Sequence, residues 1–186
     1  MHNFFKNKKR LRNLTAQTEA YRLYDRDIPE YPFIIDCYKD QVVVYDRGSR
    51  DVEPETMDQH HKEVEVAINE VLTPQKIHWK QRTPGSVKKL GSKQSRFAVK
   101  ERDSSFLVNL EDYLDTGLFL DYRGLRASLP KLVGERFLNL FSYTCTMSVQ
   151  AAKGGAKTVN VDLSQTYLDW GKENYKLNEI NPTSHI

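Results

Sequence analysis

Short apolar runs and helical repeats alternate along the first half of the chain. Runs of β-branched and aromatic residues at positions 33–38 and 42–46, on either side of a turn at 39–41, predict a β-hairpin. The segment before them, residues 21–32, is aromatic, acidic and interrupted by prolines, so it predicts an irregular link rather than a helix. Residues 3–20 are basic and compatible with a helix.

A helix is predicted over residues 57–72. Thr56 stands three residues before Gln59, which is the spacing of a capping box. Apolar residues then recur at helical spacing: Val64, Ala67, Ile68 and Val71. Residues 76–80 follow as a further strand, and residues 96–101 and 105–110 predict a second hairpin. The first part of the chain is therefore predicted to be α+β.

From Phe137 onward the pattern changes to strand, helix, strand, helix. The first strand ends at Phe141, glycines at 154 and 155 end the first helix, and the second strand ends at Asp162. This order is typical of a parallel α/β sheet with right-handed crossovers. Ser164 is the predicted N-cap of the last helix, whose Tyr and Trp stripe predicts core packing. Pro130 should end or kink any helix within residues 123–132.

The predicted fold is thus an α+β region over residues 1–110, followed over residues 111–186 by the start of an α/β sheet. Two parallel strands with their helices are too few for a complete doubly wound domain. We therefore expect the remainder of that domain to follow the printed sequence. We also expect the strand at 137–141 to lack a neighbour and to pair with a second copy of the chain through its apolar edge.

The composition narrows the class of protein. With 39% apolar and 28% charged residues, the 186-residue chain is typical of a globular protein. No apolar run suits a membrane span, and a cytoplasmic protein without membrane contact is expected. Cys37 and Cys145 are too few for a zinc cluster, and we interpret both as thiols; a single disulfide between them is the alternative. Neither they nor the histidines predict a metal site.

A net charge of +3 conceals a segregation of charge along the chain. Residues 51–70 are mostly acidic, whereas residues 75–102 are strongly basic and contain a single acid, Glu101. A basic segment with Gly and Ser but few apolar residues is suited to phosphate, because its lysines displace counterions from nucleic acid. The predicted RNA-binding residues are Arg82, Lys88, Lys89 and Lys93. The alternative is an ordinary solvated loop.

Polar residues follow both strands of the predicted parallel sheet. The loop Ser142, Tyr143, Thr144 and Cys145 comes after the first strand, and Asp162 after the second. In open α/β sheets ligands bind outside the carboxyl ends of the strands, and an acid there can accept both hydroxyls of a ribose. The pair predicts a cofactor that contains adenosine. The alternative for Asp162 is to cap the helix that follows.

Three sequence stretches carry a family resemblance: "YRLYDRDIPEYP", "VNLEDYLDTGLFLDYR" and "FLNLFSYTCTMSVQAAKGGAKTVNVDLSQTYLDWGKENYKLN". They resemble the bacterial RlmKL family of 23S ribosomal RNA guanine methyltransferases, in particular its C-terminal RlmK half, which methylates guanine N7. The likeness covers nearly the whole chain. A weaker likeness is to the RlmI-type cytosine-C5 methyltransferases of ribosomal RNA, whose N-terminal PUA domain is not evident here.

The resemblance implies a Rossmann-like class I fold that binds S-adenosylmethionine, preceded by a small region that helps to hold 23S rRNA. Arg123 would pair with the methionine carboxylate and Asp121 with its ammonium group. An Asp121–Arg123 surface pair and a core role for Phe119 are the alternatives. The resemblance places Thr116, Gly117, Phe119, Asp121 and Arg123 at the cofactor. Together with the residues at the strand ends, the full set of predicted cofactor-binding residues also includes Ser142, Tyr143, Thr144, Asp162 and Leu163.

Two departures from the family pattern matter. Cys145 stands where the family has a glycine, so backbone freedom and the approach of methionine are restricted; a nucleophilic role for this thiol is disfavoured because no His or Lys is next to it. The "DPPTF" loop that positions the target base is absent from residues 1–186. No catalytic residue is therefore assigned, and the chain alone is expected to be inactive. The competing hypothesis is an RNA-binding module without catalysis.

Overall fold

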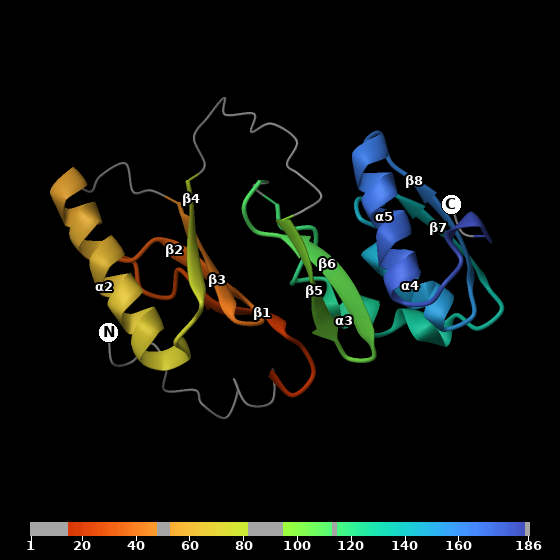
Figure 1. The fold of residues 1–186 in the computed structure, drawn as a ribbon, viewed down its shortest axis with the longest axis horizontal. Helices are drawn as coiled ribbons and strands as arrows, with labels where there is room; N and C mark the ends of the chain where they lie inside the picture. The colour runs from red at the N-terminus through yellow and green to blue at the C-terminus, as the bar shows by residue number, and fades with distance from the viewer. Residues whose placement is uncertain (1–14, 48–52, 82–94, 113–114, 185–186) are drawn as a thin grey trace. The chain divides into compact units, whose positions relative to one another are not determined.

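The computed structural model describes residues 15–47, 53–81, 95–112 and 115–184 (Figure 1). The chain divides into two compact units. The first comprises Met1–Gly91 with Leu110–Leu114, and the second Ser92–Asn109 with Asp115–Ile186. Each unit has a hydrophobic core of its own. Most of residues 3–20, where the sequence predicted a helix, lies outside the described ranges. The predicted RNA-binding residues lie wholly outside them: Arg82, Lys88, Lys89 and Lys93.

The first unit is a four-stranded sheet in the order β1-β2-β3-β4. β2 (Phe33–Tyr38) pairs antiparallel with both β1 (Ala20–Asp25) and β3 (Gln41–Asp46), and β4 (Lys76–Gln81) runs parallel to β3. α2 (Pro54–Leu72) connects β3 to β4 (Figure 1). Val64 and Ile68 of this helix pack into the same core cluster as Phe33, Ile35 and Val44 of the sheet. The predicted hairpin, helix and fourth strand are confirmed.

β1 corrects the prediction of an irregular link at residues 21–32. Its residues pair with β2 around an irregularity between Arg22 and Tyr24, and Tyr21 and Tyr24 are buried. The prolines that argued against a helix lie after the strand and do not affect its ladder. Arg22 is anchored across the pair, since its Nε and Nη2 donate to the two carboxylate oxygens of Asp36 at 2.8 and 3.1 Å.

The capping box is the second correction in this unit. α2 begins at Pro54, and its N-cap, Glu53, makes no side-chain capping bond. Proline fixes φ near the helical value and lacks the N–H that a first-turn residue would leave unpaired, so it starts the helix before Thr56 is reached. Thr56 is therefore a residue of the first turn rather than a cap.

The second unit contains a hairpin and a parallel strand pair. The hairpin is β5 (Arg96–Glu101) with β6 (Ser104–Asn109), as predicted. β7 (Arg136–Leu140) and β8 (Lys157–Val161) are parallel, with α4 (Thr146–Lys153) between them and α5 (Gln165–Leu177) after them (Figure 1). The predicted order strand, helix, strand, helix is confirmed. Ser164 is the N-cap of α5, and its Oγ accepts from Tyr167 N.

The hairpin belongs to the second unit, although the sequence grouped it with residues 1–110. α5 holds it: Trp170 Nε1 donates to Leu107 O at 3.2 Å, and Leu107 N donates to Asn174 Oδ1 at 2.8 Å. Asn178 makes a similar reciprocal pair with the backbone of Ser105. Trp170 is fully buried, in line with the predicted core role of this stripe, whereas Leu163 at its start is fully exposed.

Short helices connect the hairpin to β7. They are α3 (Arg123–Arg126) and the 3-10 turn η2 (Leu129–Lys131), and a further 3-10 turn, η3 (Pro182–Ser184), follows α5. The sequence predicted that Pro130 would end or kink a helix here, and the backbone does change from α to 3-10 geometry just before it. No helix within the described ranges is both long and apolar enough to cross a membrane.

The covered face of the β7–β8 pair carries polar groups, whereas its exposed face is apolar. The covered face carries polar groups: Asn139 Nδ2 donates to Ser148 Oγ at 2.8 Å, and Asn160 Nδ2 donates to Tyr175 Oη at 3.1 Å. The other face is apolar and exposed. It consists of Leu138, Leu140, Val159 and Val161, at 61%, 56%, 52% and 50% exposure.

Candidate cofactor site

The candidate site lies where β7 and β8 end. Both strands are parallel, so the loop after β7 and the acid after β8 meet at the same edge. Ser142 N donates to Val161 O at 3.0 Å, which extends the pairing into the loop. The segment Ser142–Cys145 and Asp162 are therefore neighbours, as the sequence predicted.

Asp162 is held by two backbone amides. Its Oδ2 accepts from Tyr143 N at 2.8 Å and its Oδ1 accepts from Ser164 N at 2.9 Å. The predicted alternative, a capping role, is thus partly realised, although the side-chain cap itself is Ser164. Each carboxylate oxygen has a second lone pair, so the fixed group can still accept hydroxyl donors.

The loop after β7 has an alternating backbone. Phe141, Tyr143 and Cys145 have φ values of 56°, 50° and 59°, in the left-handed region that glycine favours. Ser142 and Thr144 separate them. The loop uses its amides within the chain: Ser142 N donates to Val161 O, Tyr143 N to Asp162 Oδ2, and Cys145 N to Ser142 O. Cys145 therefore occupies the conformation expected of the family's glycine.

A second segment is fastened to this loop through Gly117. The Gly117 amide donates to Tyr143 Oη at 2.8 Å, and its carbonyl accepts from Thr144 Oγ1 at 2.6 Å. Gly117 has a φ of 94°, and a β-carbon there would lie 2.4 Å from Trp170. The position thus needs glycine both for its backbone and for its space. The two segments that carry the predicted site residues are in direct contact.

The remaining predicted residues of this segment differ in burial. Thr116 is buried, and its Oγ1 donates to Leu118 O at 3.4 Å. Phe119 is 42% exposed and lies 5.0 Å from the Tyr143 ring, so it is not a fully buried core residue. Asp121 is exposed and Arg123 half-buried. Among the described residues no ion pair joins these two, so their charges remain available.

Arg126 holds the second segment from the other side, and sequence reasoning missed it. Its Nε and Nη2 donate to the two carboxylate oxygens of Glu101, both at 2.7 Å, and its Nη1 donates to Phe119 O, also at 2.7 Å. Both side chains are almost completely buried. In the sequence Arg126 stood out only by its helical spacing to Leu129, which does not indicate a buried ion pair. Glu101 was visible only as the single acid of a basic stretch.

Cys145 is a buried thiol. Burial raises its pKa to about 11, and its Sγ lies 3.8 Å from Ser142 Oγ. A thiol that stays protonated and inaccessible is a poor nucleophile, which agrees with the prediction against a nucleophilic role. Cys37 in the first unit is also buried, with a pKa raised to about 12 by the same cause.

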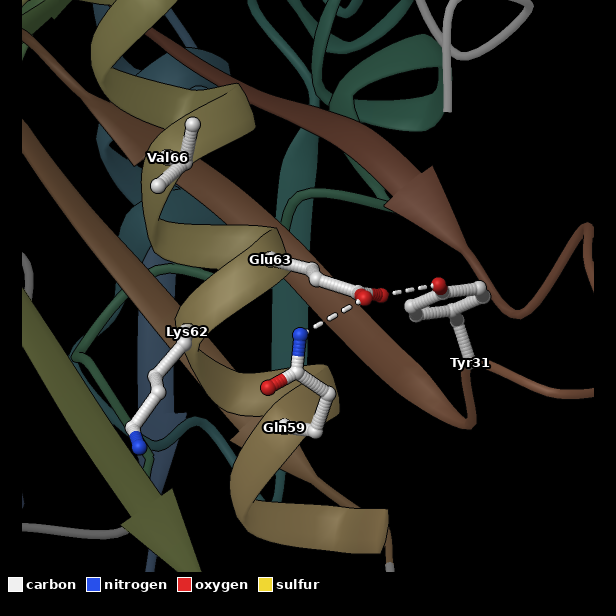
Figure 2. Close-up of a pocket in the computed structure, with 5 residues that line it drawn as sticks. All are labelled: Tyr31, Gln59, Lys62, Glu63 and Val66. Carbon is white, nitrogen blue, oxygen red and sulfur yellow. Dashed lines mark hydrogen bonds between the residues drawn. The ribbon is translucent and has the colours of Figure 1, made fainter.

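A shallow hollow of about 450 Å³ lies in the first unit, between α2 and the link before β2. Figure 2 shows Glu63 at its centre, accepting hydrogen bonds from Tyr31 Oη and Gln59 Nε2. The bond to Tyr31 lowers the pKa of Glu63, and raises that of Tyr31 to about 12. The hollow shares no residue with the predicted cofactor site. In the described parts of the chain no group of His, Cys, Asp and Glu is suited to a metal ion.

Comparisons with known proteins identify the family of the chain. Residues 77–183 match the family of S-adenosylmethionine-dependent methyltransferases. Among curated proteins, the ribosomal RNA large subunit methyltransferases K/L of Chromohalobacter salexigens and Dichelobacter nodosus are each 45% identical to the chain. The matches cover 97% and 89% of this chain but 26% and 24% of those proteins. The chain thus spans about a quarter of the length of these relatives.

Solved structures agree with the family. The methyltransferase SMU.776 in complex with S-adenosylhomocysteine (SAH) aligns over 98% of this chain and 49% of its own, with a TM-score of 0.80 and 31% identity. A methyltransferase from Agrobacterium tumefaciens, at 20% identity and a TM-score of 0.55 over 80% of this chain and 46% of its own, shares the fold. The resemblance to the RlmKL family and the partial Rossmann-like fold are confirmed. The chain belongs to the S-adenosylmethionine-dependent methyltransferase family, and S-adenosylmethionine is its cofactor.

Proposed function

We propose that this chain is the cofactor-binding part of a 23S rRNA methyltransferase that modifies guanine N7. The observation that carries the proposal is the fixed carboxylate of Asp162 at the end of β8, with Leu163 fully exposed beside it. The carboxylate would accept the ribose hydroxyls of S-adenosylmethionine. The leucine would pack against the adenine, which accounts for a large apolar side chain left entirely in solvent.

The methionine end of the cofactor would lie at the segment 116–123. Arg123 would bind its carboxylate and Asp121 its ammonium, since neither makes an ion pair with the other in the described structure. Gly117 and Tyr143 would complete the walls. Ser142 and Thr144 are buried and would support them from behind, as the Thr144 hydroxyl already donates to Gly117 O. Thr116 and Phe119 would line the same crevice. Every residue that the sequence assigned to the cofactor is retained in this proposal.

The chemistry that the cofactor supplies is an electrophilic methyl group. N7 of guanine carries a lone pair and no proton, so its methylation needs no general base, and alignment of donor and base can supply much of the rate. We propose no catalytic residue within residues 1–186. The "DPPTF" motif that the family uses to position the base is absent from them, and the chain alone should be inactive.

The RNA substrate is proposed from the names of the curated relatives and from charge. Arg82, Lys88, Lys89 and Lys93 would contact phosphates, and residues 1–110 would help to hold the RNA beside the methyltransferase unit. Ribosomal RNA is a cytoplasmic substrate in bacteria, so the proposal places the protein in the cytoplasm. Replacing Arg82, Lys88 and Lys89 with Ala should reduce the slope of log K against log salt by about 0.7 to 0.9 for each phosphate that is no longer neutralised.

The exposed apolar face of β7 and β8 would be covered by the remainder of the methyltransferase domain in the whole protein. In the isolated chain, this face and the neighbouring edge would pair with a second copy. Sedimentation equilibrium tests the second part. A monomer at high concentration would exclude the pairing between copies.

Calorimetric titration of the chain with SAH tests the cofactor site. We expect binding by the wild type, and about 10- to 100-fold weaker binding by Asp162→Asn, which keeps the shape but loses the charge. Asp169→Asn, a change at a partly exposed acid of α5, is the matched control and should bind normally. No SAH binding by the wild type would favour an RNA-binding module without catalysis.

The whole protein is needed to test the reaction. It should transfer a labelled methyl group to 23S rRNA, and chemical cleavage at N7-methylguanine should locate the product. A label on cytosine C5 would instead indicate a relative of the RlmI type.

A further inference from the structure

Four aromatic rings form a continuous row in the second unit. Tyr167 of α5 lies 4.5 Å from Tyr143, Tyr143 lies 5.0 Å from Phe119, and Phe119 lies 6.1 Å from Tyr122, as measured between ring centroids. These separations fall in the range in which aromatic pairs attract one another. The row connects α5, the loop after β7 and the segment before α3.

One end of the row is open to solvent. Phe119 and Tyr122 are 42% and 49% exposed, whereas Phe106, Trp170 and Tyr175 of the same unit are fully buried. Phe119 and Tyr122 meet edge to face, at an interplanar angle of 85°. Such a contact leaves at least one of the two rings with a face that its partner does not cover. In the described structure the Tyr122 hydroxyl has no hydrogen-bond partner.

The inner part of the row lies at the proposed cofactor site. The Tyr143 amide donates to Asp162, and the Tyr143 hydroxyl accepts from Gly117 N. Arg126 fixes the carbonyl of Phe119 at 2.7 Å. Hydrogen bonds therefore fix the row at both segments that line the site. Its open end begins at Phe119, whose backbone carbonyl is bonded to Arg126.

We propose that Phe119 and Tyr122 form a stacking platform for an unpaired nucleobase of the RNA substrate. The inference rests on the proposed function, because it identifies how the RNA reaches the site. A base inside a duplex cannot approach a methyl donor and has to be unstacked, and proteins replace the lost stacking with aromatic side chains. A platform continuous with Tyr143 would hold such a base beside the cofactor.

Stacking explains features that a general apolar contact does not. The exposed residues are aromatic and mutually oriented, and the open ring carries a hydroxyl that can donate to a base or a phosphate. Leu125, one turn later on α3, is 52% exposed and aliphatic, so it offers contact area without a π face. A partner protein would use Leu125 and Tyr122 alike, whereas a nucleobase would depend on the ring.

The experiment measures the affinity of the chain for a transcribed fragment of 23S rRNA at fixed salt, together with its affinity for SAH. Tyr122→Ala should weaken RNA binding about 5- to 150-fold, the usual effect of removing one stacked base. Tyr122→Phe keeps the ring and should bind within about threefold of the wild type. The salt slope should be the same for all three proteins, because the number of neutralised phosphates does not change.

Leu125→Ala is the matched control, and SAH affinity should be unchanged by every variant at positions 122 and 125. Equal losses for Tyr122→Ala and Leu125→Ala would indicate an apolar protein interface and overturn the platform. RNA binding by Tyr122→Ala at the wild-type level would also overturn it, while leaving the proposed function intact. If the wild type bound neither SAH nor RNA, the proposed function itself would be rejected.

Discussion

The sulfur of Cys145 occupies the space beside Gly171, 2.4 Å from where a β-carbon on that glycine would lie. α5 approaches the loop after β7 this closely because Gly171 has no side chain. The contact is reinforced next to it, where Asn174 Nδ2 donates to Thr144 O at 2.9 Å. The cysteine that departs from the family pattern is thus accommodated by a glycine on the facing helix.

Gly171→Ala should therefore destabilise the second unit by about 1–3 kcal/mol, the usual effect of overpacking a rigid contact. Denaturant unfolding followed by Trp170 fluorescence measures this, in a Trp79→Phe background that leaves Trp170 as the single tryptophan. Gly171 lies within α5, so its helical propensity works in the opposite direction, since alanine is the better helix former. A net stabilisation would show that the loop yields to the added carbon.

A compensating change at Cys145 tests the same contact. Cys145→Gly removes the obstructing side chain and suits a backbone φ of 59°. The double variant should recover most of the stability lost in Gly171→Ala, with a coupling energy of about 1 kcal/mol or more. Additive effects would mean that the two positions do not interact.

Elements with a strong local pattern were predictable from the sequence. The hairpin of β2 and β3 follows from β-branched runs around a polar turn, and Ser164 caps α5 because a hydroxyl precedes a helical repeat. The meeting of the loop after β7 with Asp162 was also predictable, since parallel strands bring their carboxyl ends together.

What the sequence did not predict depends on contacts between distant residues. β1 is a strand because it has β2 as a partner, and its mixed charged and aromatic residues show no alternation that marks it in isolation. The Arg126–Glu101 pair joins residues 25 positions apart. The Tyr143 hydroxyl reaches Gly117 across 26 positions. Neither spacing corresponds to a helix turn or a strand repeat, so no local pattern indicates these contacts.

Arg126→Met should destabilise the second unit by about 3–5 kcal/mol, because it leaves the Glu101 carboxylate buried without its partner. Arg126→Met combined with Glu101→Leu should be less damaging than Arg126→Met alone, since no charge then remains in the core. Urea unfolding of the wild type and the two variants decides this. A double variant no more stable than the single one would show that packing, rather than charge, accounts for the loss.

Two glycines of the second unit should respond oppositely to alanine. A β-carbon on Gly154 would lie 2.4 Å from the carbonyl oxygen of Pro130, and backbone cannot move aside cheaply. At Gly124, within α3, a β-carbon would meet nothing within 4 Å. Gly154→Ala should thus destabilise by about 1–3 kcal/mol, and Gly124→Ala should stabilise by about 0.4–1 kcal/mol. Thermal unfolding of the two variants tests both signs, and equal shifts would contradict the assignment.

Alkaline pH should weaken the second unit through Cys145. Burial raises the pKa of this thiol from its ordinary value of 9.0 to about 11. The folded state therefore binds a proton that the unfolded state releases at lower pH, so the contribution to stability is complete below about pH 9 and is lost as the pH rises through about 11. Each unit of the difference corresponds to about 1.4 kcal/mol.

Urea unfolding at pH 8, 9, 10 and 11, again with Trp170 as the reporter, measures the decline. Cys145→Ala removes the titrating group while keeping the β-carbon, so its free energy of unfolding should fall less steeply over this range. Cys37→Ala is the control, because Cys37 belongs to the first unit. Its replacement should leave the pH dependence of the unfolding free energy of the second unit unchanged. Parallel curves for wild type and Cys145→Ala would show that this thiol does not titrate differently in the folded protein.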